Sequence, residues 1–117
     1  MPTVLSDLAT KRLTISERML ADARYPELSL GSRLSAAFDA GYLGLLVFAD
    51  RASILMPAEH PSREVLDALK EFLDAEDYKL ALLLFEHHEL VVLPWEVAVS
   101  AKDAIAWAER MRALAVA

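Results

Sequence analysis

The chain has 117 residues, of which 56% are hydrophobic and 26% are charged, and its formal net charge is −6. This length fits one domain, residues 1–117, because two domains would each fall below the usual size of a folded unit. The apolar content excludes an intrinsically disordered chain, and the acidic balance argues against broad binding to nucleic acid or to an anionic membrane.

The sequence contains no cysteine, which excludes disulfides, thiolate zinc sites, iron–sulfur clusters and a cysteine nucleophile. This composition is typical of a reducing compartment. Charged residues divide Met1–Leu20, so no signal-peptide core fits there. The longest uncharged apolar stretch, Ala40–Ala49, is shorter than the roughly 20 residues that a membrane-spanning helix needs. We therefore expect a soluble cytoplasmic protein.

The first predicted helix runs from about Thr3 to Arg24. It ends at Tyr25-Pro26, because the residue before a proline avoids the helical region. Apolar residues recur at helical spacing along this segment. The expected inner face carries Leu5, Leu8, Ile15 and Met19, widened by Leu13 and Leu20.

A second helix is expected from Ser29 or Ser32, either of which can cap it, to about Ser53. Apolar side chains surround most of it, which is typical of a central helix or of one covered by a partner. Gly41 and Gly44 lie inside it, although glycine costs about 1 kcal/mol relative to alanine in a helix. We interpret both as points where another helix approaches closely, from the same chain or from a twin. We expect the twin to cover part of this helix or the loop around Trp95.

The next segments follow a loop between Pro57 and Pro61. Ser62 is predicted to cap a helix with an apolar face of Val65, Leu66, Leu69, Phe72 and Leu73. The run Leu80–Phe85 fits a buried helix, from about Asp77 to His88, or a strand paired with Leu90–Leu93. We favour the helix, because leucine and alanine dominate the run and the residues between the two runs lack turn formers. Leu90–Val99 is expected to be irregular around Pro94.

The last predicted helix begins with Ser100-Ala101-Lys102-Asp103, which resembles a capping box. The inner face of this helix is expected to carry Ala104, Ile105, Ala108, Met111 and Leu114. Trp107 adds a large apolar side chain that we expect to anchor the helix. The segments together predict an all-α fold, a four- to five-helix up-and-down bundle.

Glu86-His87-His88-Glu89 is the one cluster of metal-ligand residue types in the sequence. Adjacent histidines point about 100° apart on a helix, so they do not easily share an ion. A composite site of Glu86 and Glu89 with His60 would still need converging ligands, and we expect neither a metal nor a cofactor. No phosphate-binding loop or nucleophile elbow occurs, which leaves His87 and His88 as weak candidates for a catalytic acid or base.

Aromatic residues indicate another kind of site. Trp95 follows Pro94 in a largely apolar run, where a tryptophan packs between helices, lies at an interface or lines a pocket. A pocket between helices, walled by Trp95, Tyr42 and Phe72, is the arrangement that a small-ligand binder would need.

The predicted helices resemble the HEPN superfamily of small all-α domains over nearly the whole chain. The second helix has a similar small-and-aromatic pattern after a proline-containing loop, Tyr25-Pro26. The last helix has a similar short capped start after an irregular stretch. The residues that carry the resemblance are Arg33-Leu34, Ala37-Phe38, Ala40, Tyr42, Leu45 and Val99-Ser100-Ala101-Lys102-Asp103-Ala104.

The resemblance implies a homodimer, because many members pair, and a nucleotidyltransferase as a candidate partner, because many belong to toxin–antitoxin pairs. Active members are metal-independent ribonucleases that carry an arginine, four to six residues and then a histidine. Here leucine and alanine stand before His87 where that arginine should be, and Arg51 lies too far from His60. The resemblance therefore implies the scaffold and its pairing without the nuclease motif.

Three functional hypotheses follow. The first is a non-catalytic HEPN-like interaction module that acts as a homodimer. The second is a diverged ribonuclease that uses His87 or His88. The third is a small-ligand-binding helical bundle with the aromatic pocket.

Overall fold

The computed structural model describes residues 5–57, 60–90 and 92–117, and these residues form helices and loops without a strand. The all-α prediction is confirmed. Six α-helices and one 3-10 turn occur in the described ranges, where four or five helices were expected. They are α1 (Asp7–Arg24), α2 (Leu30–Arg51), α3 (Arg63–Leu69), η1 (Lys70–Phe72), α4 (Ala75–Leu90), α5 (Pro94–Val97) and α6 (Ala101–Val116).

The helices α1 and α2 form an antiparallel pair. The hydroxyl of Ser16 donates a hydrogen bond of 2.8 Å to the carbonyl oxygen of Ala40. Toward the other end of the pair, Nε of Arg33 donates to the carbonyl oxygen of Ala23 at 2.8 Å. Both donors are inside or beside the contact between the helices, so they fix how α1 lies along α2.

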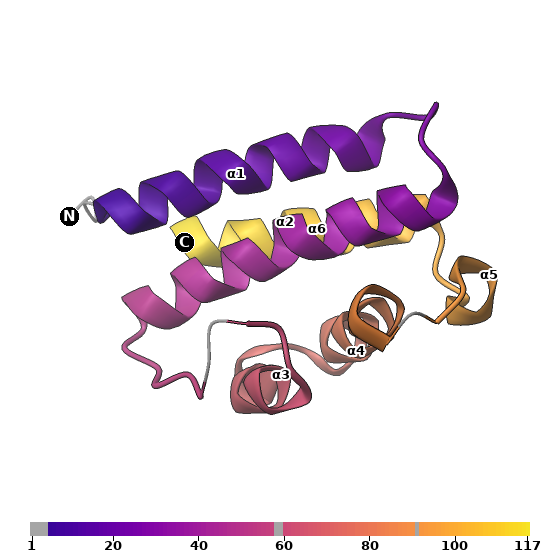
Figure 1. Ribbon diagram of the computed structural model, residues 1–117. Helices are drawn as coiled ribbons and strands as arrows, with labels where there is room; N and C mark the ends of the chain where they lie inside the picture. Colours follow the sequence, from indigo (N-terminus) through magenta and orange to yellow (C-terminus); the bar gives the residue numbers. More distant parts are fainter. Residues whose placement is uncertain (1–4, 58–59, 91) are drawn as a thin grey trace.

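The helices α2 and α6 run in the same direction, with α6 behind α2 in Figure 1. A Cβ added to Gly41 would lie 2.2 Å from the Trp107 ring, and one added to Gly44 would lie 3.0 Å from the backbone of Arg112. At the end of the pair, Arg51 donates to the carbonyl oxygen of Ala115. The predicted close approach at the two glycines is therefore confirmed, and the helix that approaches belongs to the same chain.

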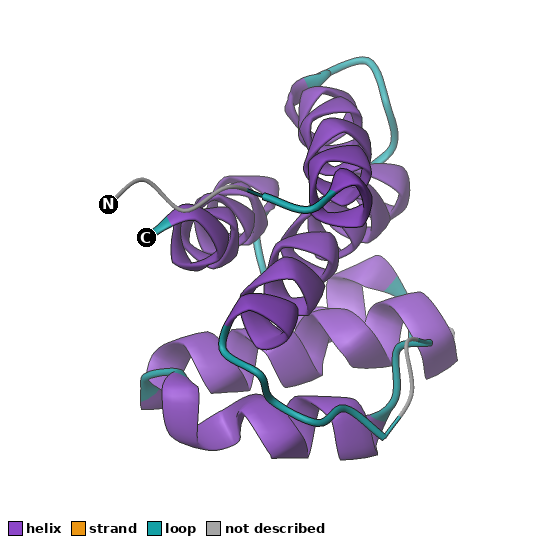
Figure 2. Cartoon of the chain, turned by 90° about the vertical axis from the view of Figure 1, so that its left-hand side faces the viewer, coloured by secondary structure: helices purple, strands orange, loops and turns teal. Residues whose placement is uncertain are grey.

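The helices α3 and α4 form a second layer, which crosses the direction of α1, α2 and α6 (Figures 1 and 2). Because α2 and α6 are parallel, the chain between them has to return from one end of α2 to the other, and α3, α4 and α5 follow one another along that return in Figure 1. The expected up-and-down order therefore holds for α1 and α2 but not for the bundle as a whole.

The core lies around α2, which packs against α1, α4 and α6. Phe38 is its aromatic centre: its ring stacks on Trp107 with a centroid distance of 6.1 Å and on Tyr42 at 5.6 Å. The indole nitrogen of Trp107 donates to the carbonyl oxygen of Asp77, at 3.1 Å. Trp107 thus joins α6 to both α2 and α4, as the sequence predicts for an anchor residue.

The buried side of α1 differs from the predicted one. Leu8 is 51% exposed and Ile15 is 44% exposed, whereas the buried positions are Ala9, Ser16, Leu20 and Ala23. Small residues on this side let α1 approach α2 closely, and the Ala40 carbonyl satisfies the Ser16 hydroxyl. The largest apolar residues of α1 therefore do not all face the core.

Most helix starts agree with the predicted caps. The side chains of Ser29, Ser62 and Ser100 each accept a hydrogen bond from a backbone N–H three residues further on. The predicted start of the first helix, near Thr3, lies outside the described residues, and α1 begins at Asp7 after a cap by Ser6. The run Leu80–Phe85 is helical, within α4, so the hairpin alternative is wrong.

The segment predicted as irregular contains the short helix α5, which begins at Pro94. Proline fits the first position of a helix, because its missing N–H is not needed there. Ala98 then takes the left-handed conformation, with φ of 58°, and ends α5 after one turn.

Candidate functional site

The histidine cluster lies where the C-terminal end of α4 meets α2. Nε2 of His88 is 2.8 Å from a carboxylate oxygen of Asp39 in α2, and its Nδ1 is 2.8 Å from a carboxylate oxygen of Glu89. The Phe38 ring covers one side, with a centroid distance of 4.8 Å to the His88 ring. The hydrogen bond that His88 donates to Asp39 raises the pKa of His88, together with the charges of both carboxylates and against the opposing effect of burial.

His87 is held by the backbone instead. Its Nδ1 lies 2.7 Å from the carbonyl oxygen of Val92, and its Nε2 lies 3.1 Å from that of Gly31 and 3.3 Å from the Ser35 hydroxyl. These contacts join the end of α4 to the loop that follows it and to the start of α2. Sequence spacing did not reveal the Ser35–His87 contact, which joins two helices that are distant in the chain.

The predicted composite site with His60 is only partly assembled. Nε2 of His60 lies 3.5 Å from a carboxylate oxygen of Glu89, which also contacts His88. Within the described ranges, no group of three or more histidine, aspartate and glutamate side chains is placed so that it could hold a metal ion. The charges of the cluster are instead arranged as neighbouring histidine–carboxylate pairs.

The three aromatic residues predicted to wall one pocket have different surroundings. Tyr42 is buried in the core, where it stacks on Phe38. Phe72 in η1 makes an edge contact with Phe48, with a centroid distance of 5.7 Å. Trp95 in α5 is 73% exposed. An open hollow elsewhere on the described surface is lined by other residues.

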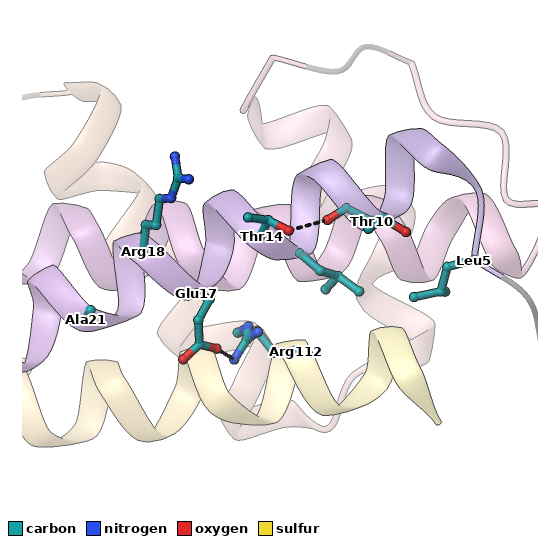
Figure 3. Close-up of a pocket in the computed structure, with 8 residues that line it drawn as sticks. Leu5, Thr10, Thr14, Glu17, Arg18, Ala21 and Arg112 are labelled. Carbon is teal, nitrogen blue, oxygen red and sulfur yellow. Dashed lines mark hydrogen bonds and ion pairs between the residues drawn. The ribbon is translucent and has the colours of Figure 1, made fainter.

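That hollow is an apolar groove between α1 and α6, shown in Figure 3. Its main part has a volume of about 560 Å³, and an adjoining part of about 310 Å³ shares Leu13 and Arg112 with it. We call the two parts together the α1–α6 groove. Its lining residues are Leu5, Thr10, Leu13, Thr14, Glu17, Arg18, Leu20, Ala21, Arg24, Glu109, Arg112, Ala113 and Val116.

Ion pairs cross the groove from one helix to the other. Nη1 of Arg112 lies 2.7 Å from a carboxylate oxygen of Glu17, and Nη2 of Arg24 lies 3.7 Å from one of Glu109. Figure 3 shows Glu17 directed toward Arg112, while Arg18 extends away from α6. Nε of Arg112 is buried, and no acceptor for it is found among the described residues. The groove therefore has apolar walls and a rim that carries both signs of charge.

Comparisons of the chain with protein-family models, with curated proteins and with solved structures find no match. In the described part of the chain, no helix combines the length and the apolar character that crossing a membrane requires.

Proposed function

We propose that this protein is a non-catalytic helical interaction module that acts as a homodimer, and that two copies pair through their α1–α6 grooves. The observation that carries the proposal is the groove itself, an open apolar hollow of about 560 Å³ between two long helices. An apolar surface of this kind is typical of a protein–protein contact. It is also the place where a bundle built on α1, α2 and α6 would receive another helix.

The charges around the groove favour a second copy as its occupant. The lining includes three arginines, Arg18, Arg24 and Arg112, and two glutamates, Glu17 and Glu109. The chain as a whole has a net charge of −6, so most of its surface repels a twin. A nearly balanced rim removes that repulsion, and a surface with both signs can be complementary to itself.

The direction of the helices also suits a symmetric pair. The contacts of Glu17 with Arg112 and of Arg24 with Glu109 show that α1 and α6 are antiparallel. In a twofold arrangement, α1 of each copy can face α6 of the other, and each copy then covers the groove of its partner. Such a face closes on itself, so it yields dimers rather than filaments.

The HEPN-like assignment is part of the same proposal. It is supported by the all-helical fold, by the long central α2 that carries the small-and-aromatic pattern, and by the Ser100 cap of α6. On this reading the exposed Trp95 is free to meet a second protein, for which a nucleotidyltransferase is the candidate.

The surroundings of the histidines support a non-catalytic role. Both ring nitrogens of His88 face carboxylates, and negative charge at this point disfavours an approaching RNA phosphate. The His87 ring is engaged by two backbone carbonyls.

Light scattering after size-exclusion chromatography at micromolar concentration tests the proposal. We expect the wild-type chain to have twice the monomer mass of 13.0 kDa. Thr14→Glu/Ala21→Glu places two new charges on exposed groove positions of α1, and we expect this variant to be a monomer. Ala75→Glu adds one such charge at an exposed position of α4, outside the groove, and should remain dimeric.

A third variant locates the interface. We expect Trp95→Ser to remain dimeric, because α5 lies outside the α1–α6 groove. A monomeric wild-type protein would contradict the whole proposal. A dimer that Trp95→Ser dissociates, and that the groove variant leaves intact, would instead place the interface around Trp95, one of the two places that the sequence predicts.

A further inference from the structure

The contacts of His88 join α4 to α2, and its partner Glu89 extends the cluster to the loop before α3. Asp39 belongs to α2, Glu89 belongs to α4, and Glu89 also reaches His60 in the loop before α3 at 3.5 Å. The His88 side chain is 21% exposed, so water does not fully replace these contacts. The charged and titratable groups around the ring are Asp39 from α2, Glu86, His87 and Glu89 from its own helix, and His60 from the loop.

Only the protonated ring can satisfy both carboxylates. An imidazolium has two N–H donors, one for Asp39 and one for Glu89, whereas a neutral imidazole has one donor and one lone pair. After loss of the proton, one carboxylate faces that lone pair. Both groups are then hydrogen-bond acceptors, so this contact becomes unfavourable. The favourable contact of a cation with the Phe38 ring, at a centroid distance of 4.8 Å, is lost at the same time.

The end of α4 that His88 holds also carries α5. Nδ1 of His87 lies 2.7 Å from the Val92 carbonyl oxygen, and Pro94 follows two residues later. A Cβ built on Gly31 would lie 3.0 Å from Cγ of Pro94, so α5 rests against the start of α2. The orientation of α5, with the exposed Trp95, therefore depends on how firmly the last turn of α4 is held on α2.

We propose that His88 is a proton-dependent clasp between α4 and α2, which fixes α5 when the ring is charged and loosens it when the ring becomes neutral. The clasp consists of His88, Asp39 and Glu89. It acts within one chain, so it does not depend on the proposed homodimer. Its direction is set by the carboxylates, which favour the charged ring and so keep the clasp closed at lower pH.

Nuclear magnetic resonance titration of the full chain tests the clasp. We expect the His88 ring to titrate with a midpoint above the usual histidine value of about 6.5. The backbone amides of Glu96 and Val97 should shift with the same midpoint. Asp39→Asn removes the α2 carboxylate and should move both midpoints down together. His60→Gln is the matched control, because His60 contacts Glu89 and not His88, and it should leave the α5 response in place.

Two outcomes would overturn the clasp. One is a His88 midpoint at or below the usual value. The other is an α5 response that persists with unchanged midpoint in His88→Gln. If His88→Gln does not fold, Asp39→Asn decides alone: amides of α5 that keep their wild-type midpoint while the His88 midpoint falls would show that the two are unconnected.

Discussion

Gly41 lies directly against the indole ring of Trp107. A Cβ at Gly41 would approach Cζ3 of that ring to 2.2 Å, a distance that real side chains do not reach. The ring itself cannot easily move, because Phe38 stacks on it at 6.1 Å and the Asp77 carbonyl accepts its N–H at 3.1 Å. The Trp107 side chain can therefore be buried against α2 only because position 41 carries no Cβ.

The first prediction concerns this contact. Gly41→Ala should destabilise the fold by about 1–3 kcal/mol through overpacking, although alanine gains about 1 kcal/mol in helix propensity. Phenylalanine at position 107 lacks the outer ring carbons that the new methyl group would meet. In urea denaturation, the double variant Gly41→Ala/Trp107→Phe should therefore cost less than the sum of the single variants, by at least about 0.5 kcal/mol.

Gly31→Ala is the matched control for that cycle. The nearest atom to its new Cβ is Cγ of Pro94, at 3.0 Å, on a short helix that can shift. We expect a smaller loss of stability, or a gain, and no coupling to Trp107→Phe. If the stability losses of Gly41→Ala and Trp107→Phe simply add, the new methyl group at position 41 does not clash with the Trp107 ring.

The second prediction concerns Gly44. Its added Cβ would lie 3.0 Å from backbone atoms of Met111 and Arg112, and a backbone cannot change rotamer. Gly44→Leu should therefore push α6 away from α2 and lower stability by about 1–3 kcal/mol or more. For a domain of this size, each kcal/mol lowers the melting temperature by several degrees. Thermal unfolding followed by circular dichroism measures this, and an unchanged melting temperature would refute the close approach.

The third prediction is a pH dependence of stability. The hydrogen bond to Asp39 raises the pKa of folded His88, whereas the unfolded value is about 6.5. Its contribution is therefore complete below the unfolded value and is lost as pH rises through the folded one. The free energy of unfolding should fall as pH rises above about 6.5, by less than about 1 kcal/mol, because Asp39 is partly exposed.

Comparison with a variant isolates this effect. His88→Gln keeps one donor without a titrating ring, so its urea midpoint should change less over the same range than that of the wild type. A wild-type protein that becomes more stable as pH rises, with His88→Gln unchanged, would reverse the assigned direction.

The fourth prediction concerns the start of α6. The Ser100 hydroxyl accepts a hydrogen bond of 3.0 Å from the backbone N–H of Asp103. Ser100→Ala should cost about 1 kcal/mol, the usual value of an N-cap, and Ser100→Asp should retain most of the stability. Equal losses for alanine and aspartate in chemical denaturation would show that the cap geometry contributes little.

Local signals explain which elements were predictable. The caps at Ser29, Ser62 and Ser100 are contacts within one turn, so the sequence contains all that they need. The helix over Leu80–Phe85 follows from the residues of the run itself, and the two glycines indicate a close approach without naming the partner. The all-α class is the sum of such local preferences.

The rest depends on contacts between distant segments. Small residues, and not the larger Leu8 and Ile15, form the buried side of α1, because close packing on α2 outweighs the burial of larger side chains at those two positions. The α1–α6 groove exists because two helices meet α2 on adjacent sides without filling the space between them. The pairing of His88 with Asp39 needs α4 to cross α2 at one register, which no spacing rule reveals.

Because α2 lies at the centre of the fold, we expect the sequence of α2 to change more slowly in evolution than the sequence of the helices around it. A substitution on α2 acts on its contacts with α1, α4 and α6 at once, so accepted changes there should be few and compensated. The groove side of α1 has exposed positions such as Thr14 and Ala21, and two ion pairs at its edges join it to α6. Homologous chains can therefore change what they recognise by varying α1, while the order of the helices around α2 stays the same.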